Sequence, residues 1–457
     1  MNRILHLGLG AFHRAHQVAY LQDLHDMGDD SWTIVAGNIR SDPFDVTDAL
    51  LAQGCAYTLE TVTPRGERAY RRIGAISRVV PFAPGQADLV AAGADPTTRI
   101  VSFTVTEAGY FLGPDGRLDQ DAPDLQASLA DTRAGRAGLT IYSVLAALLQ
   151  ARRSNGAGPV TLLCCDNLRH NGVTVRRALE QYLALCGEEA LLRWCGEHTS
   201  LPNSMVDRIT PRATPDLQAR VLAATGRIDP AAVTSESWIE WVIEDDFIAG
   251  RPAWEQVGVR MVASVAPFEE AKIRILNASH SCVAWAGALL GLEFIHEGMR
   301  DARIEALVHD YVTNAVFDCL RPSPVDLEAY RDAVIARFSG DAVRDTTARV
   351  LADSLAKLPG FIVPTIRERV KRGLPLDAVA PLPALYLAFL LRWRAGSVEA
   401  QYRDAALDQD FLERVCGAAD PVVGFCAEAI VWGDLAGSRL LANALRDAAP
   451  RIAALLP

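Results

Sequence analysis

The sequence predicts an α/β protein in two parts: a mostly parallel sheet covered by helices, then an all-helical part. Three observations support this prediction. The chain has 457 residues, which is more than one hydrophobic core usually organises. In its first third, short β-like apolar runs alternate with helical stretches, and from Pro267 onward nearly every pattern is helical. We therefore expect an N-terminal domain over residues 1–265 and a helical domain over residues 266–457.

The expected strands of the N-terminal domain are short and apolar. They lie at residues 3–7, 32–36, 99–105 and 160–165. Their alternation with helices is typical of a parallel sheet with helices on its faces. The pattern becomes irregular over residues 200–264, where residues 237–243 and 257–265 still have strand character. We expect this segment to extend the sheet.

Proline and glycine divide the helical domain into separate helices. The dividing positions are Pro322 and Pro324, residues 358–360, residues 373–375, and Pro381 with Pro383. The apolar runs 282–292 and 381–391 fall short of the roughly 20 residues that cross a bilayer, so we expect buried helices there. Neither a repeat nor a low-complexity linker separates the two parts. We expect them to pack tightly, with the active site in the cleft between them.

Charge and cysteine usage exclude several classes of function. A net charge of −11 leaves no broad basic surface, so we expect neither a nucleic-acid nor a membrane partner. Nine cysteines are scattered without a CxxC pair, which is typical of reduced thiols rather than a disulfide framework or a structural zinc site. His6 and Gly8 interrupt the first apolar stretch, so we expect a cytoplasmic protein without a signal peptide.

The segment ILHLGLGAFHR at residues 4–14 predicts a dinucleotide site. It combines a strand, a glycine turn at Gly8 and Gly10, and a helix start whose N–H groups can face a phosphate. His13 replaces the third glycine of GxGxxG, so a tight turn without a ligand remains the alternative. His13 and His16 suggest a metal, but no third ligand of suitable spacing stands nearby, and we predict none.

The choice of nucleotide depends on AGNIRSD, which follows the second expected strand. Asp42 can accept hydrogen bonds from the adenosine ribose and would repel the extra phosphate of NADP, which favours NAD. Arg40 lies two residues earlier and can instead tolerate a phosphate. A plain solvated aspartate is the other alternative.

A helix that begins near Pro267 predicts the chemical site. Proline fits the first turn of a helix, and Glu269 complements the helix dipole. The helix then carries Lys272, Asn277 and His280. At about 100° per residue, Glu269, His280 and Asn277 lie about 60°, 80° and 140° from Lys272. One side of the helix therefore presents an amine, an imidazole, an amide and a carboxylate.

The apolar residues around Lys272 predict that this helix is buried. Burial disfavours the charged form of an amine, so we expect the pKa of Lys272 to fall toward the range of a general base. Asn277 can donate to a developing alkoxide, and His280 can hold a substrate hydroxyl. The alternative is a surface lysine beside a core asparagine and a satisfied histidine.

Five motifs give the chain a resemblance to a known family. They are GLGAFHRAHQ at residues 8–17, FTVTEAGY at residues 103–110, CCDNLRHNG at residues 164–172, PNSMVDRITP at residues 202–211 and KIRILNASH at residues 272–280. Together they resemble the polyol-specific long-chain dehydrogenases and reductases, the mannitol dehydrogenase family. The resemblance covers most of the chain. It implies an extended Rossmann-type domain, then a helical domain.

The resemblance also implies roles for individual residues. Lys272 would be the general base, Asn167 and Asn277 would polarise the reacting oxygen, and His280 would bind the polyol. Asp207 would line the substrate pocket, and Glu269 would neighbour the proton path of the lysine. The implied cofactor-binding residues are Gly8, Gly10, Phe12, Arg14, Asp42, Thr106 and Glu107.

Family members also bind substrate through cations of the helical domain, are often monomers, and need no metal. Lys357 and Arg367 are the candidates for such a cation here, although a solvated helix face explains them equally well.

The implied reaction is oxidation of a sugar alcohol to a ketose with NAD. The N-terminal motifs are most similar to family members that act on D-arabinitol, which implies conversion of D-arabinitol to D-xylulose. D-mannitol to D-fructose is the nearest alternative, because a pocket discriminates poorly over one CHOH unit. A hexuronate reductase is less expected, because no basic cluster is evident. A silent NAD-binding sensor is the alternative outside enzymes.

Overall fold

The computed structural model describes residues 1–41, 46–113, 115–404 and 406–455. It divides into two compact units. The first comprises Met1–Val62 and Arg68–Ala266, and the second comprises Thr63–Glu67 and Pro267–Pro457. The sequence offered no signal that the short turn Thr63–Glu67 groups with the second unit. There, a Cβ on Gly340 would lie 3.0 Å from the Cα of Pro64.

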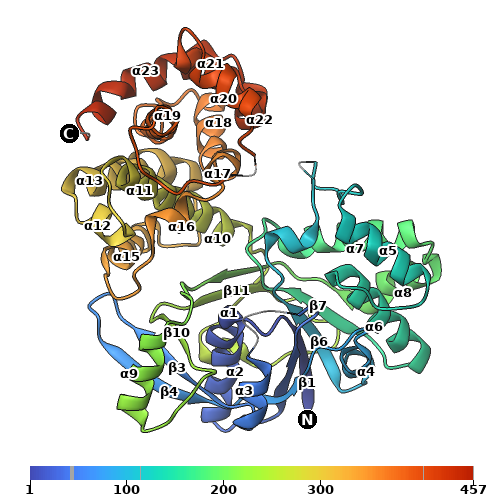
Figure 1. Cartoon of the computed structure of the whole chain (residues 1–457). Helices are drawn as coiled ribbons and strands as arrows, with labels where there is room; N and C mark the ends of the chain where they lie inside the picture. Colours follow the sequence, from blue (N-terminus) through green and yellow to red (C-terminus); the bar gives the residue numbers. More distant parts are fainter. Residues whose placement is uncertain (42–45, 114, 405, 456–457) are drawn as a thin grey trace. The chain divides into compact units, whose positions relative to one another are not determined.

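A six-stranded parallel sheet forms the centre of the first unit (Figure 1). Its spatial order is β5-β2-β1-β6-β7-β8. The strands are β1 (Asn2–Leu7), β2 (Trp32–Gly37), β5 (Ile76–Val80), β6 (Thr98–Phe103), β7 (Val160–Cys164) and β8 (Thr199–Ser200). This confirms the predicted parallel sheet. The strand order reverses between β1 and β6, and ligands of such sheets bind beyond the carboxyl ends at that point.

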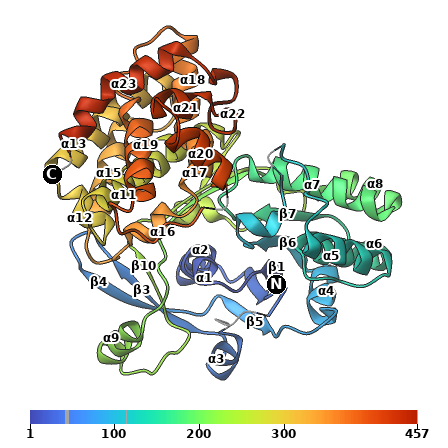
Figure 2. The same cartoon turned by 45° about the horizontal axis from the view of Figure 1, so that its top comes forward.

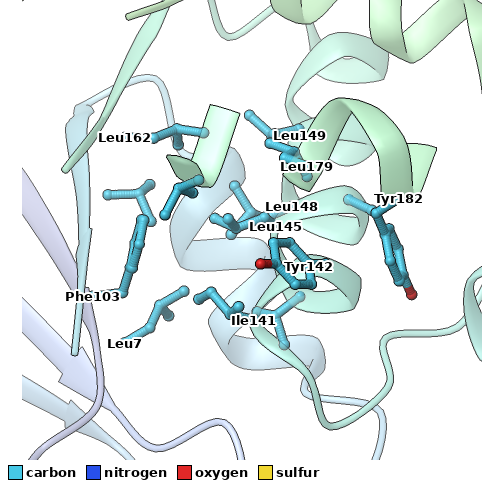
Figure 3. Close-up of a cluster of buried hydrophobic side chains, with 14 of the residues drawn as sticks. Leu7, Phe103, Ile141, Tyr142, Leu145, Leu148, Leu149, Leu162, Leu179 and Tyr182 are labelled. Carbon is cyan, nitrogen blue, oxygen red and sulfur yellow. The ribbon is translucent and has the colours of Figure 1, made fainter. Parts of the chain in front are cut away.

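Alternating side chains of these strands supply two hydrophobic cores. Leu7 of β1 and Phe103 of β6 pack in one core with Tyr142, Leu148 and Tyr182 of the helices (Figure 3). Neighbouring strand residues face the other core. The helices of this unit before β8 are α1 (Ala11–Ala15), α2 (Gln17–Asp26), α3 (Thr47–Ala52), α4 (Ala87–Ala94), α5 (Pro123–Arg133), α6 (Ile141–Asn155), α7 (Asn171–Cys186) and α8 (Glu189–His198).

Two three-stranded sheets extend the first unit. One has the order β10-β3-β4, with β10 (Val233–Glu236), β3 (Tyr57–Val62) and β4 (Arg68–Ile73), and it lies beside α9 (Pro215–Thr225) in Figure 2. The other has the order β12-β11-β9, with β12 (Arg260–Val262), β11 (Glu240–Glu244) and β9 (Ser204–Asp207). We predicted that residues 200–264 extend the parallel sheet; instead, β9, β10, β11 and β12 belong to these two separate sheets. The β3–β4 pair went unrecognised because β4 carries three arginines.

In the described residues of the second unit, helices joined by loops are the regular elements, and one isolated bridge joins Phe294 and Thr346. Helix α11 (Ala278–Leu289) is buried and contacts α12 (Ile295–Met299), α13 (Ala302–Tyr311), α16 (Thr347–Leu351), α17 (Ser354–Phe361) and α19 (Pro381–Arg394). The remaining α-helices are α10 (Ala266–Ala271), α14 (Phe317–Leu320), α15 (Leu327–Ser339), α18 (Val363–Lys371), α20 (Gln409–Cys416), α21 (Pro421–Ala427), α22 (Ala429–Trp432) and α23 (Arg439–Ala453). This confirms the helical second part. In the described residues, every helix is too short or too polar to cross a membrane.

Candidate functional site

The glycine turn after β1 lies at the reversal point of the parallel sheet. Gly8 has φ +117°, and a Cβ there would lie 2.2 Å from the carbonyl oxygen of Thr104, which follows β6. Only glycine fits such a position. A Cβ on Gly10, by contrast, would meet no atom of the described chain within 4 Å. The turn is therefore tight against β6 at Gly8 and open at Gly10, which suits the close approach of a phosphate.

His13, at the place of the third glycine, stacks on a second histidine. Its ring is parallel to that of His6 in β1, with the ring centres 3.3 Å apart. His6 lies 2.8 Å from the hydroxyl of Ser102 and 3.1 Å from that of Thr104, and His13 lies 3.2 Å from Gln17. Burial lowers the pKa of His6 to about 3 and lowers that of His13 as well. Two neutral rings thus pack the helix start against the strand. In the GxGxxG pattern, the third glycine allows this close packing.

Arg14 and Phe12, two predicted cofactor residues, have clear packing partners. Arg14 is 5% exposed, donates to the carbonyl of Ala231 and lies over the ring of Tyr57, 5.4 Å from its centre. Phe12 is partly buried and stacks on His16 at 5.0 Å. The contacts of Arg14 favour a structural role, whereas Phe12 retains some exposed surface at the turn.

The loop after β6 carries Thr106 and Glu107, and both are exposed. Thr106 has φ +65° and ψ 161°, a conformation that residues other than glycine rarely adopt. The carboxylate of Asp166 accepts the backbone N–H of Val105 at 2.7 Å and that of Thr106 at 3.2 Å. An acidic side chain from the end of β7 therefore holds the predicted cofactor loop.

Asp42, the residue on which the choice between NAD and NADP depends, lies outside the described residues. Arg40 is described and exposed.

Asn167 is exposed directly beyond β7, in a loop that Asn171 fixes. Asn171 is fully buried and donates to the carbonyls of Cys164, Asp166 and Ser204 at 3.1, 3.2 and 2.8 Å. Its own side-chain oxygen accepts the N–H of Ser204 at 2.8 Å. One asparagine thus joins the Asn167 loop to the start of β9.

Asp207 lies at the other end of β9. It is 4% exposed, pairs with Glu240 in register, and accepts the indole N–H of Trp238 at 3.1 Å. Burial and this donor hold its carboxylate in a defined place.

In the second unit, Lys272 and Glu269 are buried, with 7% and 5% exposure. The segment Lys272–Asn277 is π-helical, between α10 and α11. This corrects the angles of 60°, 80° and 140° predicted around the helix axis, which assumed about 100° per residue throughout. Hydrogen bonds of the i→i+5 type bring residues five apart into successive turns, so Asn277 lies closer to the face of Lys272 than 140° implies. Such turns are frequent at functional sites.

His280 belongs to a charged cluster. Its Nε2 lies 3.1 Å from Asp345, and its ring stacks on Phe338 at 4.5 Å. Arg349 donates two hydrogen bonds of 2.6 Å to Asp345. Burial lowers the pKa of His280; Asp345 opposes this, and the charges of Arg349 and Lys357 add to it. Burial alone would raise the pKa of Asp345, but His280 and Arg349 hold it well below its usual value.

The two candidate cations of the helical part differ in setting. Lys357 donates to the carbonyls of Val350 and Ala352 at 2.8 and 2.6 Å, and its charge acts on the nearby imidazole. Arg367 is exposed and pairs with Asp434 at 2.8 Å on the surface. The structure therefore brings Lys357, and not Arg367, into the electrostatic range of His280.

Sequence reasoning missed four residues of these clusters. Asp166 and Asn171 lie within the motif CCDNLRHNG. Their local sequence does not show whether their side chains bond to distant loops, as they do here, or only cap their own loop. Asp345 and Arg349 have the i,i+4 spacing of a helix ion pair, which is a weak signal because surface pairs share it. Among the described residues, no group of three or more His, Cys, Asp or Glu side chains is placed to share a metal ion.

A glycine turn at the reversal point of a parallel sheet, followed in the chain by a helical unit with a buried lysine, defines a two-domain dinucleotide-binding protein of the Rossmann type. Residues 2–256 match the mannitol dehydrogenase Rossmann domain, and residues 264–453 match the mannitol dehydrogenase C-terminal domain. The chain belongs to the mannitol dehydrogenase family.

Individual relatives cover nearly the whole chain. D-arabinitol 4-dehydrogenase of Ralstonia nicotianae is 52% identical, with 99% of this chain and 96% of that protein covered. D-arabinitol 4-dehydrogenase of Klebsiella pneumoniae is 47% identical, with 95% and 94% covered. The structure of Pseudomonas fluorescens mannitol 2-dehydrogenase, a ternary complex with NAD and D-mannitol, aligns with a TM-score of 0.85 at 32% identity over 99% of this chain and 93% of that one.

Proposed function

We propose that this protein oxidises D-arabinitol to D-xylulose, with NAD as the hydride acceptor and Lys272 as the general base. As a member of the mannitol dehydrogenase family, the chain is an NAD-dependent polyol oxidoreductase. The observation that carries the choice of substrate is the 52% identity to a D-arabinitol 4-dehydrogenase along nearly the whole length of both chains. D-mannitol is the runner-up, because relatives that act on it are less similar, at 35% identity for the Cereibacter sphaeroides mannitol 2-dehydrogenase.

The residues of the first unit fit a dinucleotide. Gly10 leaves space at the turn, Gly8 keeps the turn against Thr104, and Thr106 is exposed in the loop that follows β6. Bound NAD supplies the hydride acceptor. Asp42 would favour NAD over NADP by repelling a phosphate on the ribose.

Lys272 would take the proton of the reacting hydroxyl. The chain contains only three lysines, and this one is 7% exposed within the π-helical segment. Burial favours the neutral amine that a base requires. Asn277 and Asn167 would donate to the oxygen as negative charge develops on it, and Glu269 would pass the proton toward solvent.

The charged cluster would hold the remaining hydroxyls of the polyol. A polyol hydroxyl both donates and accepts, so it can bridge an imidazole and a cation. His280 would orient the chain of the substrate, with Asp345 fixing the imidazole and Lys357 adding a donor. Asp207, which lies in the first unit, would accept a hydrogen bond from one hydroxyl of the polyol.

The test is to incubate the purified protein with NAD and D-arabinitol, follow NADH, and identify the sugar formed. We expect D-xylulose, the product of oxidation at C4. D-ribulose would show oxidation at C2 and contradict the proposed position. Binding of NADH without turnover of any polyol would support a sensor instead of an enzyme.

The proposal assigns proton removal to an amine, so it needs no metal. We expect full activity after treatment with EDTA and gel filtration. Loss of activity that zinc restores would contradict this part of the proposal.

A further inference from the structure

Thr106 adopts a backbone conformation that needs external support. At φ +65° and ψ 161°, a residue with a side chain is strained, and such residues persist only where their surroundings hold them. Both oxygens of the Asp166 carboxylate supply this support, one for the N–H of Val105 and one for the N–H of Thr106. Hydrogen bonds to an ionised acceptor are about twice as strong as neutral ones.

Asp166 is itself held from two directions. The hydroxyl of Tyr110, a fully buried residue, donates to the same carboxylate at 2.6 Å and lies 3.1 Å from the thiol of Cys164. The backbone carbonyl of Asp166 accepts from Asn171 at 3.2 Å. Because Phe103 of β6 pairs with Cys164 of β7, the loops that follow the two strands leave the sheet at the same edge. The carboxylate ties these two loops together.

We propose that Asp166 is a positioning residue that fixes the cofactor loop at Thr106 and the side-chain amide of Asn167 relative to each other. Asn167 is the next residue in the chain, so a shift of Asp166 moves it directly. This inference rests on the proposed function, in which Thr106 faces the nucleotide and Asn167 polarises the reacting oxygen. A small displacement of such groups costs much more in turnover than in affinity for the polyol.

The surroundings of Asp166 make the clamp sensitive to acid. The titratable groups that act on it include Tyr110, Cys164 and Glu107. Burial raises the pKa of Asp166, the hydrogen bonds from Tyr110 and the backbone oppose this, and the charge of Glu107 adds to the rise. As the pH falls through this raised pKa, protonation removes one of the two acceptors. NADH affinity should therefore decrease as the pH falls through this raised pKa.

The test compares Asp166→Asn with the wild type in NADH binding by fluorescence and in steady-state turnover of D-arabinitol. Asparagine keeps the shape but can accept only with one oxygen. We expect the Kd for NADH to rise about tenfold and kcat to fall about 100-fold, with the KM for D-arabinitol changed less than threefold. We also expect the acid decrease in NADH affinity to disappear in the variant, which a merely structural role would not produce.

Asp95→Asn is the matched control. Like Asp166, Asp95 accepts a backbone N–H, that of Thr97 at 2.8 Å, and it also pairs with Arg3. It lies, however, at the amino ends of β6 and β1, the opposite edge of the parallel sheet. It should leave the Kd for NADH and its pH profile within twofold of the wild type. If Asp166→Asn does not fold, Tyr110→Phe is measured in its place. This variant keeps the carboxylate and its bonds to the backbone and loses only the hydrogen bond from the tyrosine hydroxyl. That variant should shift the acid decrease in NADH affinity to higher pH.

The outcomes separate the inference from the function on which it rests. A wild type that does not bind NADH overturns both. A wild type that binds NADH and oxidises D-arabinitol, with Asp166→Asn equal to it in Kd, kcat and pH profile, overturns the inference alone. If Asp166→Asn does not fold, an unshifted pH profile in Tyr110→Phe overturns it in the same way.

Discussion

Two aspartates, one in each unit, are held in opposite ways. Asp166 accepts backbone N–H groups and a tyrosine hydroxyl, and burial raises its pKa. Asp345 pairs with an imidazole and a guanidinium, which hold its pKa well below the usual value. The proposed cofactor side thus depends on hydrogen bonds to the backbone and on the neutral pair His6 and His13, whereas the proposed substrate side depends on charges. If these sides bind as proposed, the nucleotide and the polyol depend on different interactions, and single substitutions should separate the two binding steps.

The largest separation is expected for Lys272→Ala. Removal of the base should lower kcat by about 10³-fold, while the Kd for NADH stays within twofold, because the lysine lies in the unit that lacks the glycine turn. Steady-state rates and NADH fluorescence measure the two quantities. Lys371→Ala, at an exposed lysine, is the matched control and should behave as the wild type. Comparable turnover in Lys272→Ala would remove this lysine from the mechanism.

The next largest effect is expected for Asp345→Asn. The change removes the negative charge that pairs with Arg349 and the carboxylate that lies 3.1 Å from Nε2 of His280. We expect kcat/KM for D-arabinitol to fall about 30-fold, as the net value of such a contact predicts, with NADH affinity unchanged. Asp341→Asn, which disrupts an exposed ion pair with Arg300, is the control. Weaker NADH binding in Asp345→Asn would contradict the separation of the two sides.

On the cofactor side, Gly8→Ala and Gly10→Ala form an informative pair. A Cβ at Gly8 meets the carbonyl of Thr104 in a strained backbone conformation, so we expect a loss of about 1–3 kcal/mol in the free energy of unfolding and weaker NADH binding. A Cβ at Gly10 meets no described atom of the chain within 4 Å, so stability should hold while NADH affinity falls. Thermal unfolding and NADH titration distinguish them. Equal stability of the two variants would show that the turn is not tight at Gly8.

The smallest effect is expected for Arg367→Ala. The pair with Asp434 is exposed, and pairs of this kind contribute about 0.2–1 kcal/mol. The KM for D-arabinitol should stay within twofold of the wild type, whereas Lys357→Met should raise it about tenfold, because that cation acts on His280. A larger effect at Arg367 than at Lys357 would reverse the assignment.

The sequence was sufficient to predict the elements with strong local patterns. The glycine turn after β1 and the spacing of Lys272, Asn277 and His280 are local, and both were visible. The π-helical segment was not, because its residues are as compatible with a regular α-helix. Contacts between separate segments, such as His6 with His13 and His280 with Asp345, were also not predicted. The type of a residue alone does not show which residue of another segment it contacts.

The most direct test of the proposed function is a comparison of kcat/KM for D-arabinitol and D-mannitol with NAD, at mildly alkaline pH where an amine base is neutral. We expect a clearly higher value for D-arabinitol. A higher value for D-mannitol would contradict the proposed substrate, although the family, the cofactor site and the proposed base would stand.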